Sequence, residues 1–294
     1  MKQNNTSTLR RSLLFTPGLR VDRFAKALSG GADIVCIDLE DGVAPDFKEE
    51  ARDKAIPALF DATLGGTNGG AARAMRINPI KTQLGMRDVL ALCDFGTPPP
   101  ALLLPKIEAP EDVRWVAEIL NEAGYVETQL MVIIETGRAL EAALDIAVAS
   151  PRINTLLFGA ADLSAELGSS LDWEALHYAR GRAVHAASSA GLDLIDVPHL
   201  DIKDEDGLRR EARLAQRMGF TGKAAIHPVQ IPAINDVFSP SAETISFARR
   251  VIEAYEGSAA GVTLLDGKVV EMPVVRAMRR ALAIADKVAS GTNS

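Results

Sequence analysis

Several short apolar runs in this chain end in side chains that could bind a charged ligand or a metal ion. Glu135 ends the run MVIIET, and Asp162 follows the run LLFGAA. Two carboxylates that face one centre suit Mg²⁺, which prefers oxygen ligands and keeps positions for water or substrate oxygens. Zinc would favour His or Cys, and the chain has only four His and two Cys. We therefore expect Glu135 and Asp162 to hold magnesium; the alternative is that they cap the helices that follow.

Arg76, in the segment MRINP, ends another such run. A fixed guanidinium there could hold a carboxylate or a developing enolate through two parallel hydrogen bonds. The alternative is a structural salt bridge to the acidic cluster of Asp38, Glu40 and Asp41, and the two roles are compatible. Like charges in that cluster cost free energy unless cations offset them. We expect one of these carboxylates, with Asp41 as the candidate, to orient Arg76 or a metal-bound water.

Other ionisable side chains end the remaining runs, including Lys106 in LPKIE, Asp196 with His199, and His227 in IHP. Lys106 and His227 could contact a substrate, although a lone His can equally be hydrogen-bonded within the protein. An ordinary core strand ends more often on Gly, Ser or Asn. Convergence of so many ionisable groups indicates a charged ligand, a metal, or both.

The spacing of the apolar runs predicts alternating strands and helices. Amphipathic segments separate eight runs rich in β-branched residues, at 12–18, 33–41, 72–78, 101–106, 129–136, 154–163, 192–198 and 222–228. Their continuous apolar character is typical of a parallel sheet buried on both faces. We predict an α/β fold, a TIM (β/α)₈ barrel of roughly 250 residues, with its active site at the carboxyl ends of the strands.

The predicted barrel, the catalytic domain, covers residues 1–238. Residues 239–294 read as helix, short hairpin and helix, a C-terminal lid extension beyond what closing a barrel requires. The Gly-rich segment LGGTNGGAA from Leu64 predicts a flexible turn, and GTPPPA from Gly96 a stiff lead into the fourth strand. Neither resembles a domain linker.

Composition narrows the class of partner. The net charge is −7, and no basic stretch with interleaved aromatics occurs, which argues against nucleic acid and anionic membrane surfaces. No apolar run approaches the roughly 20 residues of a membrane span, and the polar first residues lack a signal-peptide core. Cys36 and Cys93 have no metal-ligand spacing. We expect a soluble cytoplasmic protein with small-molecule partners.

Nine motifs, in order along nearly the whole chain, resemble the HpcH/HpaI aldolase and citrate lyase superfamily. They are RSLLFTPG from Arg11, DRFAKAL from Asp22, IDLEDGVAP from Ile37, the ARxK element at Ala51, RIN at Arg76, LPKIE from Leu104, IIET from Ile133, FGAADLSAELG from Phe158 and GKAAIHP from Gly222. Within that superfamily the chain resembles citrate lyase β-subunit-like proteins, malyl-CoA lyases and citramalyl-CoA lyases.

The resemblance implies a magnesium-dependent carbon–carbon lyase that cleaves a β-hydroxyacyl-CoA into an acyl-CoA and a 2-oxo acid. It implies that Glu135 and Asp162 hold Mg²⁺, that Arg76 binds the oxo acid, and that backbone amides after Gly159, at Ala161, receive its carboxylate. The residues implied to line the coenzyme A channel are Phe15, Lys26, Ile226 and His227.

The resemblance also implies a role for the tail. Relatives carry an acid/base Asp in a DGKMIDMP-like turn, and here LLDGKVVEMP places Glu271 at that position, with Asp266 nearby as an alternative. In such proteins the tail covers a neighbouring subunit of a trimer or hexamer, so we expect a homo-oligomer.

Three other functions remain open from the sequence. A thioesterase would use the same enolate chemistry but end in attack by water. A carrier-dependent or noncatalytic subunit would replace free coenzyme A with a carrier protein. An aldolase acting on a free hydroxy-oxo acid would be expected to place a metal-binding His near the barrel mouth, where this chain offers two carboxylates.

Overall fold

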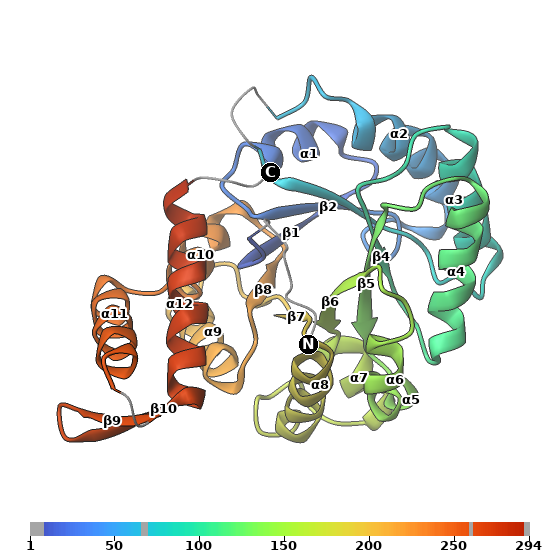
Figure 1. The fold of residues 1–294 in the computed structure, drawn as a ribbon. Coiled ribbons are helices and arrows are strands. Elements are labelled where there is room, and N and C mark those ends of the chain that lie inside the picture. Colours follow the sequence, from blue (N-terminus) through green and yellow to red (C-terminus); the bar gives the residue numbers. More distant parts are fainter. Residues whose placement is uncertain (1–8, 66–69, 259–260, 291–294) are drawn as a thin grey trace.

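Eight parallel strands close into a barrel in the computed structural model, which describes residues 9–65, 70–258 and 261–290 (Figure 1). Each strand pairs with the next along the chain, and β1 closes the ring by pairing with β8. The strands are β1 (Ser12–Pro17), β2 (Ile34–Asp38), β3 (Ala72–Arg76), β4 (Ala101–Leu104), β5 (Gln129–Ile134), β6 (Ile153–Phe158), β7 (Asp193–Asp196) and β8 (Gly222–Ala225). The predicted TIM barrel and its eight strands are confirmed.

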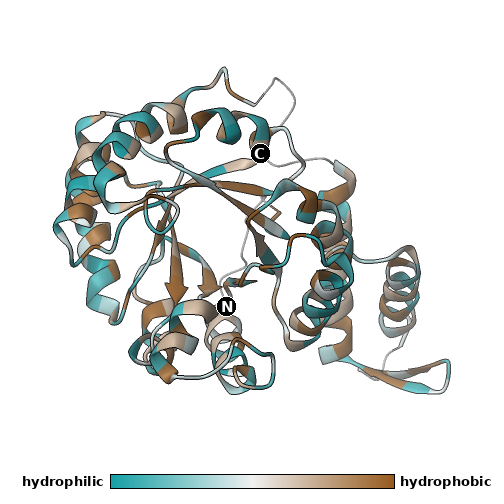
Figure 2. Ribbon diagram, turned by 180° about the vertical axis from the view of Figure 1, so that it is seen from behind, coloured by the Kyte–Doolittle hydropathy of each residue, from teal (hydrophilic) through white to brown (hydrophobic). Residues whose placement is uncertain are grey.

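Alternation along each strand separates two apolar layers. Leu13, Cys36, Ala74, Ile133 and Ile195 belong to one buried cluster, which fills the barrel interior. Their strand neighbours point the other way, into a larger cluster shared with the surrounding helices. Figure 2 shows the resulting pattern, with largely hydrophobic strands inside helices of mixed character. Residues along a strand therefore form two alternating rows, one facing the barrel interior and one facing the helices. A side chain at the end of a strand points inward or outward according to the row that it continues.

Helices surround the strands. They are α1 (Val21–Leu28), α2 (Lys48–Phe60), α3 (Gln83–Asp94), α4 (Pro110–Glu122), α5 (Gly137–Glu141), α6 (Ala143–Ala147), α7 (Ala160–Leu167), α8 (His177–Ala190), α9 (Glu205–Met218) and α10 (Ile231–Val237), with short 3₁₀ turns η1 (Pro45–Phe47) and η2 (Pro228–Gln230). Gly191 and Gly219 end α8 and α9 in the left-handed conformation, which glycine adopts without strain at a helix C-cap. The amphipathic segment between the apolar runs at 129–136 and 154–163 forms two short helices, α5 and α6, which meet at Ala142.

The C-terminal tail contains the expected helix, hairpin and helix: α11 (Ala242–Glu256), β9 (Val262–Leu265), β10 (Lys268–Glu271) and α12 (Met272–Ser290). Asp266 and Gly267, both with positive φ, form the two-residue hairpin turn. Val251, Val270 and Val275 form a small apolar cluster of the tail's own. In Figure 1, α12 lies beside the barrel helices, whereas α11 and the hairpin stand away from the barrel. The boundary at residue 238 between two domains stays a prediction.

Two sequence expectations fall partly outside the described residues. The flexible turn predicted from Leu64 includes residues 66–69, and the segment judged for a signal peptide begins with residues 1–8. Among the residues that the structure does describe, no helix is both long and apolar enough to cross a membrane.

Candidate active site

The inward rows of three barrel strands end in ionisable side chains. Asp38, Arg76 and Glu135 each lie two positions after an interior residue of β2, β3 or β5, so they continue the rows that face the barrel axis. They line a cavity of about 410 Å³ at the carboxyl ends of the strands, where TIM barrels place their active sites. Asp41, Asp162 and Phe15 line the same cavity.

Arg76 is held by the acidic cluster that follows β2. Its Nε and Nη2 donate to the two carboxylate oxygens of Asp38 at 2.7 and 2.6 Å, and its Nη1 lies 2.8 Å from Glu40 Oε2. Asp41, whose carboxylate is largely exposed, lies 3.6 Å from the same guanidinium. The ring of Phe15 lies 4.8 Å from the guanidinium carbon, within cation–π range. The predicted salt bridge is present, and it fixes a guanidinium that also lines the cavity.

Burial changes the acid–base chemistry of this cluster. Desolvation raises the pKa of Glu40 to about 8, although the charge of Arg76 opposes the shift. Burial by itself lowers the pKa of Arg76, but the Asp38 hydrogen bonds and the surrounding carboxylates raise it above its ordinary value. Arg76 is therefore a permanent cation, whereas Glu40 is largely protonated at neutral pH.

Glu135 and Asp162 meet across the side chain of Lys106. The Lys106 ammonium lies 2.5 Å from Asp162 Oδ1 and 3.8 Å from Glu135 Oε2, and the Lys106 backbone N–H donates to Glu135 Oε1 at 2.7 Å. Lys106 adopts a φ of 51°, which is rare for a residue with a side chain and is a mark of functional sites. Desolvation raises the pKa of Glu135 to about 7.

The turn into α7 brings backbone close to these carboxylates. A Cβ at Gly159 would lie 2.3 Å from the Glu135 Cβ, so glycine is required there. α7 begins at Ala160, and the N–H groups of its first turn, including that of Ala161, have no partner inside the helix. With Asp162 in that turn, the site offers anion-binding amides next to a carboxylate.

The donor set fits a magnesium ion. A cationic group, the ammonium of Lys106, already lies between Glu135 and Asp162, so the local field favours positive charge at that point. Within the described residues, no group of three or more His, Cys, Asp or Glu side chains could hold a metal. A bound Mg²⁺ would therefore take most of its oxygen ligands from water or substrate, as this ion commonly does.

The wall formed by β7 and β8 is apolar. Val197, Pro198, Leu200, Ala224 and Ile226 line the cavity there. Asp196 borders the cavity too, but its carboxylate is engaged by Lys223 Nζ at 2.7 Å and by Arg180 Nε at 3.3 Å. The cavity thus joins a charged half to an apolar half, which suits a ligand with an anionic and an apolar part.

Comparison with known proteins identifies the family. The model of the HpcH/HpaI aldolase/citrate lyase family matches residues 11–228. The chain is 36% identical over 285 residues to a (3S)-malyl-CoA thioesterase of Cereibacter sphaeroides, covering 95% of this chain and 96% of that protein. It is 31% identical over 301 residues to the mitochondrial citramalyl-CoA lyase of Homo sapiens, covering 95% and 86%. This chain belongs to the HpcH/HpaI aldolase/citrate lyase family.

Solved structures agree with that assignment. The protein CitE from Mycobacterium tuberculosis, solved in complex with magnesium, acetoacetate and coenzyme A, is 33% identical, with a TM-score of 0.79 and coverage of 95% of this chain and 99% of that one. RipC from Yersinia pestis is 39% identical, with a TM-score of 0.71 and coverage of 82% and 100%.

The structure brings together only part of the site that membership of this family leads us to expect. Phe15 and Ile226 line the cavity, whereas Lys26 and His227 do not. Lys26 lies exposed on α1, and His227 caps η2 by accepting a hydrogen bond at Nδ1 from the Val229 N–H, the role in the rim that the sequence left open.

Glu271 is not part of the cavity of its own chain. Within the described part of the chain, every residue that lines the cavity precedes position 227. Glu271 is exposed at the end of β10 and pairs in the hairpin with Val262, and Asp266 forms an ion pair with Arg250. A catalytic role for Glu271 in this family member stays a prediction that needs a second copy of the chain.

Two supporting residues were missed from the sequence. The buried Lys48 donates to the backbone oxygens of Leu39 and Glu40 at 2.7 and 2.6 Å, which holds the acidic loop in place. The buried Asp88 accepts from the Asn78 N–H and side chain at 2.8 and 2.7 Å, two residues after Arg76. Asp88 lies inside α3, and no local pattern distinguishes it from an exposed helical Asp.

Proposed function

We propose that this chain is a magnesium-dependent lyase that cleaves a β-hydroxyacyl-CoA, of the malyl, citramalyl or citryl type, into an acyl-CoA and a 2-oxo acid. The observation that carries the proposal is the place of the Lys106 ammonium between Glu135 and Asp162, in the cavity that also contains Arg76. That arrangement combines a cation position with a fixed guanidinium, as the stabilisation of a developing enolate and alkoxide requires.

The residues of the chain divide the task. When bound at Glu135 and Asp162, magnesium would supply Lewis-acid polarisation of the substrate oxygens. Arg76 donates hydrogen bonds to the oxo-acid portion, and the amides at the start of α7, at Ala161, bind its carboxylate. The carboxylate cluster behind Arg76 prevents the guanidinium from moving with the substrate, since it is held on two sides.

The bond changes balance without an additional reactant. The β-hydroxyl loses its proton, the adjacent carbon–carbon bond breaks to leave the carbonyl of the 2-oxo acid, and the electron pair passes to the α-carbon of the thioester. A proton then returns to that carbon. Asp41, exposed beside Arg76, is our candidate for the first transfer, and Glu271 from a neighbouring copy in a trimer or hexamer is our candidate for the second.

The apolar half of the cavity would receive the thioester arm. Phe15 and Ile226 lie on its walls, and the exposed side chains of Lys26 and His227 are proposed to contact coenzyme A outside the cavity. We place this reaction in the cytoplasm, since Cys36 and Cys93 are both free and neither forms a metal site with other described residues.

The test is product analysis with each thioester. Wild-type protein with Mg²⁺ should release a 2-oxo acid without free thiol, and Glu135→Ala should abolish that release. The matched control is Glu118→Ala, which removes an exposed carboxylate of α4 and should change nothing. Absence of any 2-oxo acid from all three thioesters, in protein that binds Mg²⁺, would contradict the lyase.

A thioesterase is the second candidate, supported by the 36% identity to a malyl-CoA thioesterase. Water would attack the thioester carbonyl and release coenzyme A as a free thiol together with the intact hydroxy acid. Free thiol without 2-oxo acid in the same assay would therefore decide for it. Activity only on a carrier-protein thioester would decide for the carrier-dependent subunit.

A further inference from the structure

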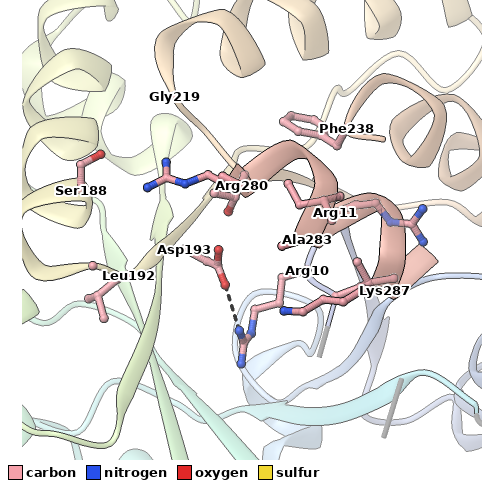
Figure 3. A pocket seen from close by; sticks show the side chains of 14 residues that line it. Arg10, Arg11, Ser188, Leu192, Asp193, Gly219, Phe238, Arg280, Ala283 and Lys287 are labelled. Carbon is pink, nitrogen blue, oxygen red and sulfur yellow. Dashed lines mark hydrogen bonds and ion pairs between the residues drawn. The ribbon is translucent and has the colours of Figure 1, made fainter. Parts of the chain in front are cut away.

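A second cavity, of about 340 Å³, lies at the end of the barrel opposite the candidate active site (Figure 3). Arg10 and Arg11, which precede β1, line it together with Asp193, the first residue of β7. Arg280 and Lys287 line it from α12. The cavity therefore joins the amino ends of the strands to the last helix of the tail.

Positive charge exceeds negative charge in this cavity. Arg10 pairs with Asp193 at 2.8 Å, and Arg11 is turned toward Asp33, 2.7 Å away. These two pairs are neutral. Arg280 adds a further positive charge, and it forms no ion pair with any residue that the structure describes. In a chain of net charge −7, such an excess indicates a site for negative charge.

Two of the cationic groups, those of Arg10 and Arg11, are held in position by other residues of the protein. The side chain of Arg10 is only 7% exposed and is oriented by Asp193, while Arg11 donates both to Asp33 and to Ser239 Oγ, 2.8 Å away. In Figure 3, Asp193 lies between Arg10 and Arg280, and the Lys287 side chain extends back toward Arg10. Phe238 and Leu192 supply apolar walls.

We propose that this cavity binds a small multivalent anion, a phosphate ester or a polycarboxylate, which bridges α12 to the barrel. Guanidinium groups match the planar or tetrahedral oxygens of such anions, and the cavity volume lies in the range of small-molecule sites. The anion would contact Arg280 on α12 and Arg10 before β1 together, and the ion pair with Asp193 already holds Arg10 in place.

A bound anion would also hold the tail. α12 begins at Met272, directly after the hairpin strand β10 that carries Glu271, so any ligand that fixes α12 restrains the orientation of the hairpin. This inference does not depend on the proposed lyase reaction. It predicts ligand-dependent order in α12 whether or not the chain cleaves a thioester.

The test is calorimetric titration with inorganic pyrophosphate and, separately, citrate, each at constant ionic strength so that general screening is excluded. Wild-type protein should bind one probe saturably, and Arg280→Ala should weaken that binding about tenfold or more, as loss of a charged hydrogen-bonding group does. Arg279→Ala is the matched control, because the adjacent Arg279 is exposed and pairs with Glu256.

The two probes separate a phosphate ligand from a carboxylate ligand. Slower amide hydrogen exchange across α12 in the presence of the bound probe would support the bridge. Equal binding by wild-type protein and Arg280→Ala would place the anion elsewhere, for example beside Arg76, and would overturn the proposal. Absence of saturable binding by either probe would overturn it as well.

Discussion

The rim of the barrel has two halves, in which the buried charged side chains point in opposite directions. On the side of β2, β3, β5 and β6, Arg76 and Glu135 continue the interior rows and face the cavity. On the side of β7 and β8, Lys223 and Asp196 follow the outward rows and meet behind the barrel wall, 2.7 Å apart. Both halves contain ionisable strand-end residues, so residue type does not distinguish them.

Charge balance does distinguish them. In the outward network two cations meet two carboxylates: Lys223 and Arg180 contact Asp196, and Lys223 also lies 3.4 Å from Glu211. Arg180 is further packed against the rings of Trp173 and Phe158. At the cavity, Arg76 and Lys106 form ion pairs with five carboxylates, those of Asp38, Glu40, Asp41, Glu135 and Asp162. The neutral network is structural. At the cavity the carboxylates outnumber the cations, and this excess can be offset by protonation, which the raised pKa values of Glu40 and Glu135 favour, or by a bound cation.

The largest effect should come from Glu135→Gln. Magnesium affinity and lyase activity should fall at least about 100-fold, since loss of a direct ligand exceeds the effect of losing an outer hydrogen bond. The free energy of unfolding should hardly change, because burial already disfavours the charged form of Glu135, as its raised pKa shows. Metal titration and urea unfolding measure the two effects. If Glu135→Gln lowered the free energy of unfolding strongly and still bound magnesium, Glu135 would be a structural residue, and the two halves of the rim would not differ in role.

The opposite result is expected from Lys223→Met. Removing one partner of a fully buried ion pair leaves Asp196 poorly compensated and should lower the free energy of unfolding by about 3–5 kcal/mol. Metal affinity should stay unchanged in the folded protein. Lys54→Met is the control, because Lys54 forms an exposed pair with Glu50 and its loss should have an effect of about 0–1 kcal/mol. Weaker metal binding in Lys223→Met would show that the network also positions the site.

This difference between the halves also separates what the sequence predicts from what it does not. The strands could be predicted from the sequence, and so could the positions of Arg76, Glu135 and Asp162 at strand ends. An apolar run followed by an ionisable residue can be recognised in the linear sequence. The direction of Asp196 could not, since strands buried on both faces show no alternation, and a shift by one residue reverses every side chain. The place of Glu271 relative to the cavity depends on contacts beyond one chain, which no local pattern contains.

Magnesium should stabilise the folded protein through the half of the rim in which carboxylates outnumber cations. Adding the metal at about 100 times its dissociation constant should raise the free energy of unfolding of the wild-type protein by about 2.7 kcal/mol, and chelation should reverse the gain. Lys223→Met should gain the same amount, whereas Glu135→Gln should gain almost nothing. Thermal or urea unfolding with and without the metal checks this. An equal gain in all three proteins would locate the metal away from Glu135.

The smallest effect should come from the apolar wall. Ile226 is 44% exposed and lines the cavity next to the outward network, so Ile226→Ala removes contact area without exposing a buried charge. A loss of one or two methylene contacts from a substrate arm corresponds to roughly 1–2 kcal/mol, or about tenfold in KM, with kcat and metal affinity unchanged. Val229→Ala is the control, because Val229 is similarly exposed but lies outside the cavity lining. A fall in kcat instead of a rise in KM would mean that the apolar half takes part in the bond-breaking step, and the division of the rim into a reactive half and a binding half would have to be abandoned.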